Sequence, residues 1–562
     1  GYGLSYTEFE QKMGELEEKD GQISVDVEVT NTGDVAGKDV VEVYYKPPYT
    51  NGGIEKSSAN LIEFAKTDLL QPGESQTVTV TFSIEDMASY DENNAKAYVL
   101  EKGDYVISIN SDSHTVLDQK TYTVDKDVVY KGENKRSSDD TAATNVFEDA
   151  KGDVTYLSRA DHFANYEEAT AAPASAELGE PYVSEYHLNS NFDKTTYLND
   201  EDVMPTTGAD NGLTLADMRD ADYDDPRWEK LLDQLTVDEM TNMIAMAGYQ
   251  TAAMDSVGKV ATLEFDGPAA INNNFTGVGS IGFPIEVVVA STWNKELAQT
   301  WGECMGKISQ EMGAEGWYAP GMNTHRTAFG ARNYEYFSED AVLTAGQGAA
   351  IIKAGHDYGV LIAPKHLAFN DTEINRTGIA EFMTEQAARE NELRGTQSCI
   401  EDANALAVMT TYNRVGCVTS NAHTGLLLNI LHKEWGFKGL MSEDFIQDPA
   451  YTKIHMAVHN GVTMTCNTGD NTMAAVEAVW PYWSVENASQ SEELLTDLKQ
   501  AMLYQNYALA NSNAMDGMST STHIEKLNTW YDNLITGLRI GFGVLTVLCA
   551  AMYLLGLKKK EQ

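Results

Sequence analysis

Two adjacent carboxylic acids, Glu443 and Asp444, interrupt the apolar segment "GFKGLMSEDF" at residues 436–445 and stand directly before an aromatic residue. A carboxylate can act as a nucleophile, and a carboxylic acid can act as a general acid. Successive side chains on a strand point to opposite faces, so the two acids cannot both enter one site. We therefore expect one working acid in this segment and its partner elsewhere.

Polar residues also follow other hydrophobic segments. They are Asp266 after "VATLEF"; Arg326, Arg332 and Glu335 after "GWYAP"; Lys365, His366, Asn370, Asp371 and Arg376 after "VLIAP"; and Tyr412, Asn413 and Arg414 after "ALAVM". Functional groups of a parallel barrel gather where its strands end. The carboxylate of Asp266 could accept hydrogen bonds from two hydroxyl groups and the cations could donate to others, which fits a neutral polyol. Each residue alone could equally be a strand cap or a surface ion pair, but the shared rim favours a site.

Strand-like and helix-like segments alternate from residue 213 onwards, which predicts repeated β-α units and a parallel sheet. The candidate strands are "KVATLEF", "FPIEVVVA", "EGWYAP", "GVLIAP", "ALAVMTT", "KGLMS" and "GVTMTC". The segments 294–313, 339–359, 384–403 and 423–436 resemble helices, several with a capping Asp, Thr or Asn at the start and Gly at the end. The pattern predicts a (β/α)8-type TIM barrel over residues 213–515, with one strand still to be found.

The N-terminal region has a different pattern of apolar and polar residues. Residues 1–127 alternate apolar and polar side chains in short runs separated by turn signals, which predicts a small antiparallel β-sandwich. Residues 128–212 have little periodicity and many small polar residues, so we expect an irregular connector without a core.

Composition excludes several classes of function. The formal net charge of -46 repels nucleic acid, so partners should be neutral or cationic. The five cysteines form no CxxC pair and no ligand cluster with histidines, so we expect no metal. No glycine-rich phosphate loop follows any candidate strand, which disfavours nucleotide chemistry, and we expect no cofactor.

The C-terminal region contains a long uncharged segment. Residues 540–557 lack charge and are followed by Lys558, Lys559 and Lys560. Eighteen residues at about 1.5 Å each nearly span a bilayer, so we expect a transmembrane helix after a juxtamembrane segment at 516–539. The lysines should lie in the cytoplasm and the folded domains outside the cell membrane. The alternative is a buried terminal helix.

The motifs "FDGPAAIN", "GARNYEYFSED", "KHLAFNDTEINR", "MTTYNRVG" and "GFKGLMSEDF" together resemble the barrel of glycoside hydrolase family 3, the β-glucosidase-like exo-glycosidases. The segments "VTNTGDVAGKDVVEVYY" and "LLQPGESQTVTVTF" resemble the family's fibronectin type III-like domain. The resemblance implies that Asp444 is the nucleophile of a retaining mechanism. It also implies that Asp266, Arg332, Lys365, His366, Arg376, Met409 and Tyr412 bind the sugar. Glu443, Asn272 and Phe445 depart from the usual residues, which leaves the preferred sugar open.

A retaining mechanism needs a second carboxylic acid, roughly 5 to 5.5 Å from the nucleophile. In relatives this glutamate usually comes from an α/β sandwich domain that ends in a segment like "GYGLSYTEF", which is residues 1–9 here. We therefore expect a permuted domain order, with residues 1–9 as a remnant of that domain and the acid/base upstream of Gly1.

Three alternatives stay open. The chain could be a β-xylosidase or α-arabinofuranosidase of the same family, because the same polar set can hold several neutral sugars. It could be a membrane-tethered carbohydrate-binding protein without turnover. Asp444 and Glu335 could form the catalytic pair within this chain, although the resemblance places Glu335 beside Arg332 as support.

Overall fold

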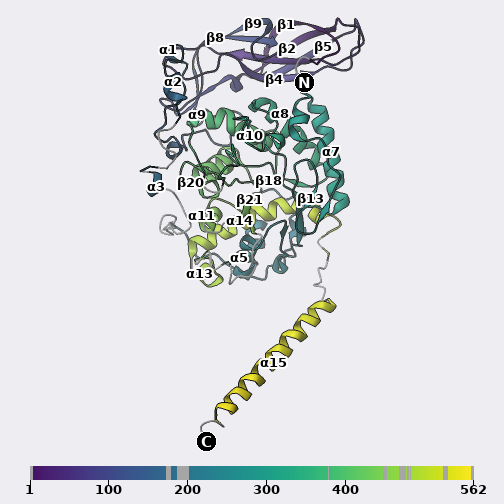
Figure 1. The fold of residues 1–562 in the computed structure, drawn as a ribbon, viewed down its shortest axis with the longest axis vertical. Coiled ribbons are helices and arrows are strands. Elements are labelled where there is room, and N and C mark those ends of the chain that lie inside the picture. Colours follow the sequence, from purple (N-terminus) through teal and green to yellow (C-terminus); the bar gives the residue numbers. More distant parts are fainter. Residues whose placement is uncertain are drawn as a thin grey trace. The chain divides into compact units, whose positions relative to one another are not determined.

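The computed structural model describes residues 4–172, 179–180, 182–185, 201–376, 379–446, 452–467, 476, 480, 482–519, 521–522 and 529–558. The chain forms two compact units, Gly1–Gly517 and Met518–Gln562. The first unit contains a β-sandwich and a barrel-like domain (Figure 1).

The predicted sandwich is confirmed. One sheet has the order β1 (Phe9–Lys19), β2 (Gln22–Asn31), β5 (Ser75–Ser83), and the other has β4 (Asn60–Lys66), β3 (Val40–Lys46), β8 (Gly103–Asn110), β9 (Val116–Val124). A smaller sheet joins β6 (Ser89–Asp91), β7 (Ala97–Leu100) and β10 (Val128–Tyr130). Alternation on β2 buries Ile23, Val25, Val27 and Val29 while the residues between them stay more exposed, which gives the sheet one core-facing side.

The expectation of a connector without a core is wrong for its first part. Strand β10 pairs with β7, Ala143 joins the sandwich core, and Phe147 and Ala150 join the barrel core. The segment thus runs between the two domains and packs against both. Further along lie α1 (Ala160–Phe163), α2 (Tyr166–Ala169) and α3 (Tyr182–Glu185), whereas 173–178 and 186–200 lie outside the described residues.

Short parallel strands form the centre of the barrel-like domain. They are β12 (Thr262–Phe265), β15 (Gly316–Trp317), β16 (Leu361–Ile362), β18 (Ala407–Met409), β21 (Leu440–Ile446) and β22 (Met464–Asn467). Backbone hydrogen bonds from Met409 N to Pro364 O (3.1 Å) and from Leu367 N to Met409 O (2.8 Å) connect the β16 and β18 segments. All six overlap segments that the sequence predicted as strands, although β21 extends to Ile446 and β22 to Asn467, beyond the predicted ends.

Two features differ from the predicted regular parallel barrel. Strand β11 (Gln250–Thr251) pairs antiparallel with β12. The segment "FPIEVVVA" was predicted as a strand but contains the helix α6 (Glu286–Ala290), so that prediction is wrong. Short apolar segments rich in β-branched residues do not distinguish a buried helix from a strand by periodicity.

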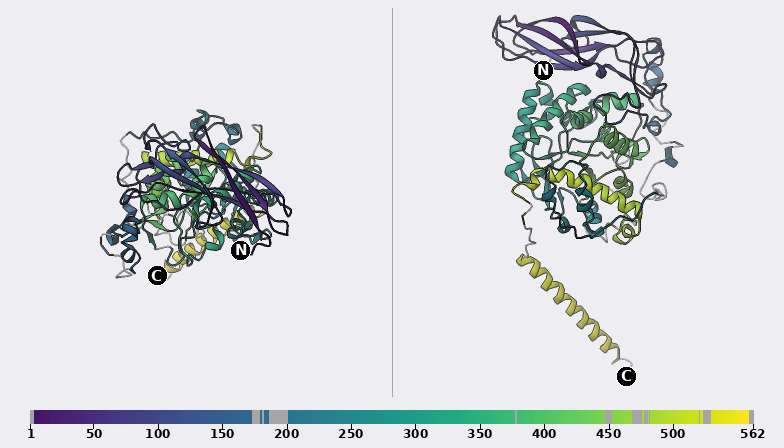
Figure 2. Two further views of the ribbon diagram at one scale, coloured as in Figure 1. Left: turned by 90° about the horizontal axis from the view of Figure 1, so that it is seen from above. Right: turned by 180° about the vertical axis from the view of Figure 1, so that it is seen from behind.

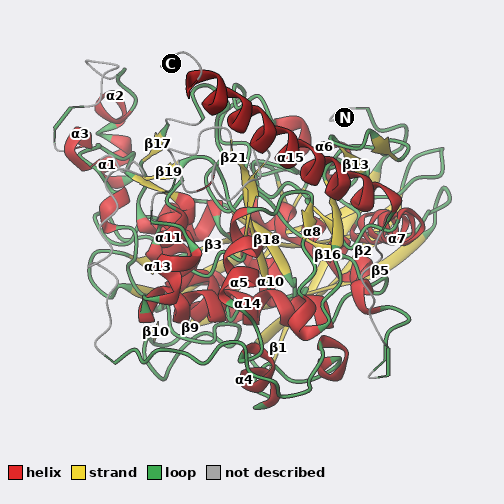
Figure 3. Ribbon diagram, turned by 90° about the horizontal axis from the view of Figure 1, so that it is seen from below, coloured by secondary structure: helices red, strands yellow, loops and turns green. Residues whose placement is uncertain are grey.

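Helices surround these strands (Figure 3). The main ones are α7 (Lys295–Met312), α8 (Ala341–His356), α10 (Arg394–Glu401), which is eight residues long, the π-helical η10 (Gly425–Glu434), and α14 (Glu492–Ala510). Shorter ones are α4 (Arg227–Leu232), α5 (Val237–Ala245), α9 (Glu385–Ala387), η8 (Ala388–Glu392), α11 (Ile454–His459) and α13 (Val485–Ser489). The predicted caps are confirmed: Asn294, Asp340 and Thr384 each accept a backbone N–H of the helix that follows.

The remaining described strands and helical turns are short and lie in loops of the sandwich, the connector and the barrel-like domain. These are the hairpin of β13 (Asn272–Asn273) and β14 (Val278–Gly279), the sheet of β17 (Ala380–Glu381), β19 (Arg414–Val415) and β20 (Val418–Thr419), and the 3-10 turns η1 (Ile84–Met87), η2 (Glu148–Ala150), η5 (Leu215–Met218), η6 (Asp255–Val257), η7 (Asn333–Glu335), η9 (Ser420–Ala422) and η11 (Asn513–Met515).

The second unit contains one long helix, α15 (Trp530–Lys558). It begins at Trp530 rather than at the predicted Ile540, and its stretch Trp530–Leu555 has a mean hydropathy of 2.0. Its length and composition suffice to cross a membrane.

A buried arginine joins the sandwich, the connector and the barrel; the connector runs along the edge of the other two (Figure 2). Arg389 of η8 contacts Glu385 at 2.8 Å and Glu434 at 2.7 Å, and it donates to the connector carbonyl of Thr144 at 2.7 Å. Its guanidinium also lies over the ring of Tyr90 from the sandwich at 4.8 Å. Because Arg389, Glu385 and Glu434 are all buried, each charge depends on its partners.

Replacing this arginine should therefore destabilise the first unit. We expect Arg389→Met to lower the free energy of unfolding by about 3 kcal/mol, because two buried carboxylates lose their cation. Arg394→Met is the matched control, since Arg394 makes only a 3.7 Å ion pair with Asp86 near the surface. Urea denaturation of both variants would measure the difference, and equal effects would contradict the role given to Arg389.

Candidate active site

The polar residues that follow separate strands meet in one cavity of about 460 Å³. Six of the seven residues predicted to bind the sugar line it, together with the predicted nucleophile: Asp266, Arg332, Lys365, His366, Arg376, Met409 and Asp444. They come from the ends of β12, β16, β18 and β21 and from the loops after β15 and β16. Their convergence follows from the parallel order of the strands, whose carboxyl ends share one face.

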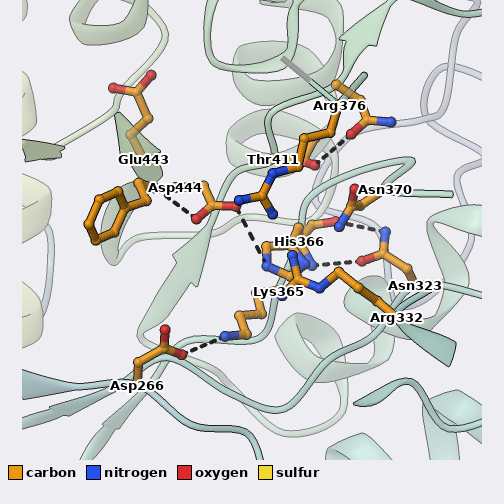
Figure 4. A network of polar contacts seen from close by, with 12 residues as sticks. Asp266, Asn323, Arg332, Lys365, His366, Asn370, Arg376, Thr411, Glu443 and Asp444 are labelled. Atoms are coloured by element: carbon orange, nitrogen blue, oxygen red, sulfur yellow. Dashed lines mark hydrogen bonds and ion pairs between the residues drawn. The ribbon is translucent and has the colours of Figure 1, made fainter. Parts of the chain in front are cut away.

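Asp444 lies on β21 with its side chain directed into the cavity (Figure 4). Its Oδ1 accepts a hydrogen bond from the backbone N–H of Phe445 at 2.6 Å, and its Oδ2 is 3.7 Å from Nε2 of His366. Burial raises the pKa of Asp444 to about 6, although Arg332, Lys365 and Arg376 oppose that shift. At neutral pH the carboxylate is therefore mostly ionised, although only 14% of its side chain is exposed.

Glu443 points away from Asp444 (Figure 4). Its carboxyl group accepts hydrogen bonds from Thr452 Oγ1 at 2.9 Å and from the amide of Asn421. Burial raises the pKa of Glu443 to about 8, so this acid is largely protonated at neutral pH. The predicted alternation of the two acids is confirmed.

Buried Lys365 forms an ion pair with the partly exposed Asp266, with 2.6 Å between Nζ and Oδ1 (Figure 4). Tyr249 also donates its hydroxyl to Asp266 Oδ2 at 2.9 Å. Burial alone would raise the pKa of Asp266, but Lys365 and these hydrogen bonds lower it overall. Asp266 is thus held ionised as a hydrogen-bond acceptor and is unsuited to donate a proton.

Arg332 and Arg376 both form ion pairs with the same acid, Glu373. Its Oε1 is 3.3 Å from Arg332 Nη1, and its Oε2 is 2.8 Å from Arg376 Nη1. Glu335 accepts from Nε of Arg332 at 2.7 Å and does not line the cavity. The two acids fix the directions of the guanidinium groups, so Glu335 has the supporting position that the family resemblance implied.

His366 is held by hydrogen bonds at both its backbone and its ring. Asn323 accepts from the backbone N–H at 2.9 Å and donates to the backbone carbonyl at 3.0 Å, while Nδ1 is 3.2 Å from the hydroxyl of Tyr336. Burial, followed by the nearby Arg332 and Lys365, lowers the pKa of His366 well below its usual value. The ring is therefore neutral, with Nε2 facing Asp444.

Tyr412 was predicted to bind the sugar, but it does not line the cavity. Its ring lies under the guanidinium of Arg376, with 4.4 Å between the ring centre and the Cζ atom. Tyr412 thus contacts the site through Arg376.

The cavity is also lined by residues that were not predicted from the sequence: Tyr249, Asn274, Tyr318, Ala331, Tyr334, Glu373 and Cys466. Glu373 precedes Arg376 by three residues in "KHLAFNDTEINR", and this spacing is the signal that could have found it. Tyr249 comes before the first predicted strand, so no strand-end pattern includes it. Among the described residues, no group of three or more His, Cys, Asp or Glu side chains could hold a metal ion.

Comparison with known proteins identifies the two domains of the first unit. Residues 249–506 match the Glycosyl hydrolase family 3 N terminal domain, and residues 39–113 match the Fibronectin type III-like domain. The match confirms the predicted resemblance.

Two similar proteins are bacterial. Beta-glucosidase A of Butyrivibrio fibrisolvens is 30% identical over 512 residues, which cover 85% of this chain and 59% of that protein. A beta-glucosidase of Ruminococcus albus is 31% identical over 499 residues, which cover 85% of this chain and 50% of the relative. This chain thus spans 59% of the length of the first relative and half of the second.

A solved structure has a similar fold. The crystal structure of a beta-glucosidase from Paenibacillus barengoltzii matches with a TM-score of 0.73 at 24% identity, over 93% of this chain and 57% of that one. This similarity supports the arrangement of sandwich and barrel-like domain.

The raised pKa of Asp444 predicts a stability effect with a definite sign. The folded state binds the proton more tightly than the unfolded chain, whose aspartate has an ordinary value of 3.8, so ionisation of Asp444 costs stability as pH rises. Between about pH 5 and pH 8, the free energy of unfolding of Asp444→Asn should rise by about 1 kcal/mol relative to that of the natural chain.

Urea denaturation across this pH range would measure that difference. Asp225→Asn is the control: Arg227 lowers the pKa of Asp225 to about 2, so its effect should stay nearly constant above pH 5. A difference for Asp444→Asn that does not change with pH would contradict the buried, uncompensated carboxylate.

Proposed function

Since residues 249–506 belong to glycosyl hydrolase family 3, we propose that this chain carries the sugar-binding and nucleophilic part of a retaining exo-glycosidase. The substrate is a glycoside or oligosaccharide with a terminal β-linked sugar, and β-D-glucose fits the names of the relatives. The observation that carries the proposal is the buried carboxylate of Asp444 in a cavity lined by three cations and by the ion-paired acceptor Asp266.

Asp444 would attack the anomeric carbon and form a covalent glycosyl-enzyme, with retention of configuration after hydrolysis. Its Oδ1 is occupied by the Phe445 N–H, while Oδ2 has no hydrogen-bond partner among the described residues. Oδ2 is therefore the attacking oxygen. The side chain of Asp444 is largely buried, which limits its hydration, and the neutral ring of His366 forms no charged pair with it.

The sugar hydroxyls would be held by charged partners whose directions are fixed. Asp266 accepts, and Arg332, Lys365 and Arg376 donate, each oriented by an ion pair. Met409 and the ring of Phe445 supply apolar contact surface in the same cavity. A neutral sugar without an acidic group suits this set, because each cation already has an anionic partner.

The acid/base is proposed to come from outside the described cavity lining. The described acids that line the cavity are Asp266, Glu373 and Asp444. Asp266 is kept ionised by Lys365, and Glu373 is bound by two guanidinium groups, so neither is set up to protonate the leaving oxygen.

Trapping the intermediate tests the nucleophile. We expect 2,4-dinitrophenyl 2-deoxy-2-fluoro-β-D-glucoside to label Asp444 stoichiometrically, because its leaving group departs without general-acid help. Mass spectrometry of peptides would locate the label. Asp444→Asn should abolish labelling, whereas Glu443→Gln, the adjacent control, should retain it.

Two outcomes would contradict this assignment. Labelling of another residue would overturn the role of Asp444. Reversible sugar binding without labelling would favour a carbohydrate-binding protein without turnover, and faster labelling by the xyloside or arabinoside would change the sugar assigned to the cavity.

The second proposal concerns α15, which we infer to anchor the chain in the cell membrane with its first unit outside. The helix has 29 residues, and at about 1.5 Å per residue it exceeds the roughly 30 Å of a bilayer core. Its first residues, Trp530 and Tyr531, are of the type found at membrane interfaces.

Membrane anchoring predicts that the full chain stays in the membrane pellet after alkaline carbonate extraction. A chain that ends at Gly517 should be released, because it retains the complete first unit and lacks the apolar helix. Release of the full chain would refute the anchor, and protection of the barrel-like domain from protease on intact cells would refute the outward orientation.

A further inference from the structure

A second acid is buried on the strand that leads to Asp266. Glu264 of β12 stands two residues before Asp266, and alternation along a strand places both side chains on the same side. Glu264 is only 3% exposed and does not line the cavity, whereas Asp266 does. Burying a carboxyl group is costly unless it has a partner, so the contacts of Glu264 indicate its role.

The partner of Glu264 is a tyrosine of the cavity wall. The hydroxyl of Tyr318 donates to Oε2 of Glu264, just as the hydroxyl of Tyr249 donates to Oδ2 of Asp266 at 2.9 Å. The rings of the two tyrosines meet edge-on, with centres 5.5 Å apart and planes inclined by 78°. Both tyrosines line the cavity. Two acid–tyrosine pairs thus lie in contact, and one of them contains an acid proposed to bind the sugar.

Among the described residues, no other side chain donates to the carboxyl group of Glu264, and no cation forms an ion pair with it. Lys259 acts on it electrostatically, but the amino group of Lys259 donates to three oxygens of the segment 251–260, at 2.6 to 3.0 Å. The hydroxyl of Tyr318 is therefore the group that this buried acid serves.

Loss of Glu264 would be felt at Asp266. Tyr318 is only 2% exposed, so its hydroxyl would be left buried without an acceptor, and the side chain would turn to find another. The ring of Tyr318 contacts that of Tyr249, which would then lose its support. Lys365 would still hold Oδ1 of Asp266, but the bond that fixes Oδ2 would weaken.

We propose that Glu264 is a positioning residue of the sugar site that acts through two tyrosines. It fixes the hydroxyl of Tyr318, and the ring of Tyr318 fixes Tyr249. Tyr249 in turn orients Oδ2 of Asp266 towards the sugar hydroxyls. The inference rests on the proposed function, because it takes Asp266 as an acceptor for the sugar.

Glucose affinity tests this role. The affinity of the full chain would be measured by calorimetry at pH 8, in a detergent that contains no sugar. We expect Glu264→Leu to weaken glucose binding about tenfold, because Tyr318 loses its acceptor. Glu264→Gln keeps an acceptor and a similar shape, so its affinity should stay within about threefold of that of the natural chain.

Removing the tyrosine hydroxyl as well should restore binding. In Glu264→Leu/Tyr318→Phe neither partner is left unpaired, so we expect the glucose affinity to return to within about threefold of the natural value. If Glu264 only supported the fold, the second substitution would add to the loss. Thermal unfolding of each variant would show that the fold is kept.

The pH profile gives a second measurement, which does not depend on the folding of Glu264→Leu. Burial raises the pKa of Glu264 to about 7, and the titratable groups around it are Tyr318, Lys259, Glu315 and Cys466. Above this pKa the bond from Tyr318 ends on a charged acceptor and is stronger. The affinity of the natural chain relative to Glu264→Gln should therefore rise about threefold from pH 6 to pH 8, while the other groups are the same in both chains.

The sandwich offers a matched control. The hydroxyl of Tyr44 donates to Oε2 of Glu42 at 3.0 Å, and burial raises the pKa of Glu42 to about 7, as it does for Glu264. Neither residue lines the cavity. Glu42→Leu and Glu42→Leu/Tyr44→Phe should leave the glucose affinity within about twofold.

The outcomes separate the two proposals. The positioning role is refuted, and the sugar site stands, if Glu264→Leu binds glucose like the natural chain or if Tyr318→Phe fails to restore its affinity. An affinity ratio between the natural chain and Glu264→Gln that does not change with pH would refute it too. If neither the natural chain nor any variant binds glucose, the proposed function fails, and the positioning role fails with it.

Discussion

The site depends on keeping several charges out of water without leaving any of them alone. Arg332, Lys365 and Arg376 line one cavity with the carboxylates of Asp266, Glu373 and Asp444, and Glu335 pairs with Arg332 from outside it. Removing such groups from water is costly unless each finds a partner, so the positions of the side chains are strongly determined by one another. Asp444 is the exception: it has no ion pair with a lysine or arginine among the described residues, and burial of its charged form raises its pKa.

That imbalance suits a nucleophile. A carboxylate in a tight ion pair would be stable and unreactive. Asp444 interacts with Arg332, Lys365 and Arg376 only through longer-range electrostatics. Residues behind the cavity hold His366 in place: Asn323 and Tyr336 bond to it directly, and Asn370 donates to the hydroxyl of Tyr336. Short strands of two to seven residues suffice for the scaffold because their ends, and not their lengths, position the cavity.

Much of this arrangement could be predicted because it is local or periodic. Alternation on β21 separated Glu443 from Asp444, and polar residues after successive strands gave most of the cavity lining. Pairing across the fold could not be predicted: Lys365 and Asp266 are far apart in sequence, and only the folded barrel shows which cation meets which acid. The helix α6 was missed because three consecutive valines favour a strand locally, and its burial against the loop of Glu335 is a tertiary effect. The buried part of the connector was missed because single residues such as Phe147 leave no period.

The connector has a consequence for how the domains can be exchanged between proteins. Phe147 packs in the barrel core, and the backbone N–H groups of Val146 and Phe147 both donate to Glu385. The boundary at which this barrel-like domain becomes self-sufficient therefore lies upstream of residue 146, well before the first barrel helix. Recombination at residue 128 would keep Phe147 with the barrel, whereas a cut at residue 213 would leave a hole in the barrel core and remove both backbone donors from Glu385 Oε2. The segment that looks like a linker in the sequence is thus inherited with the barrel.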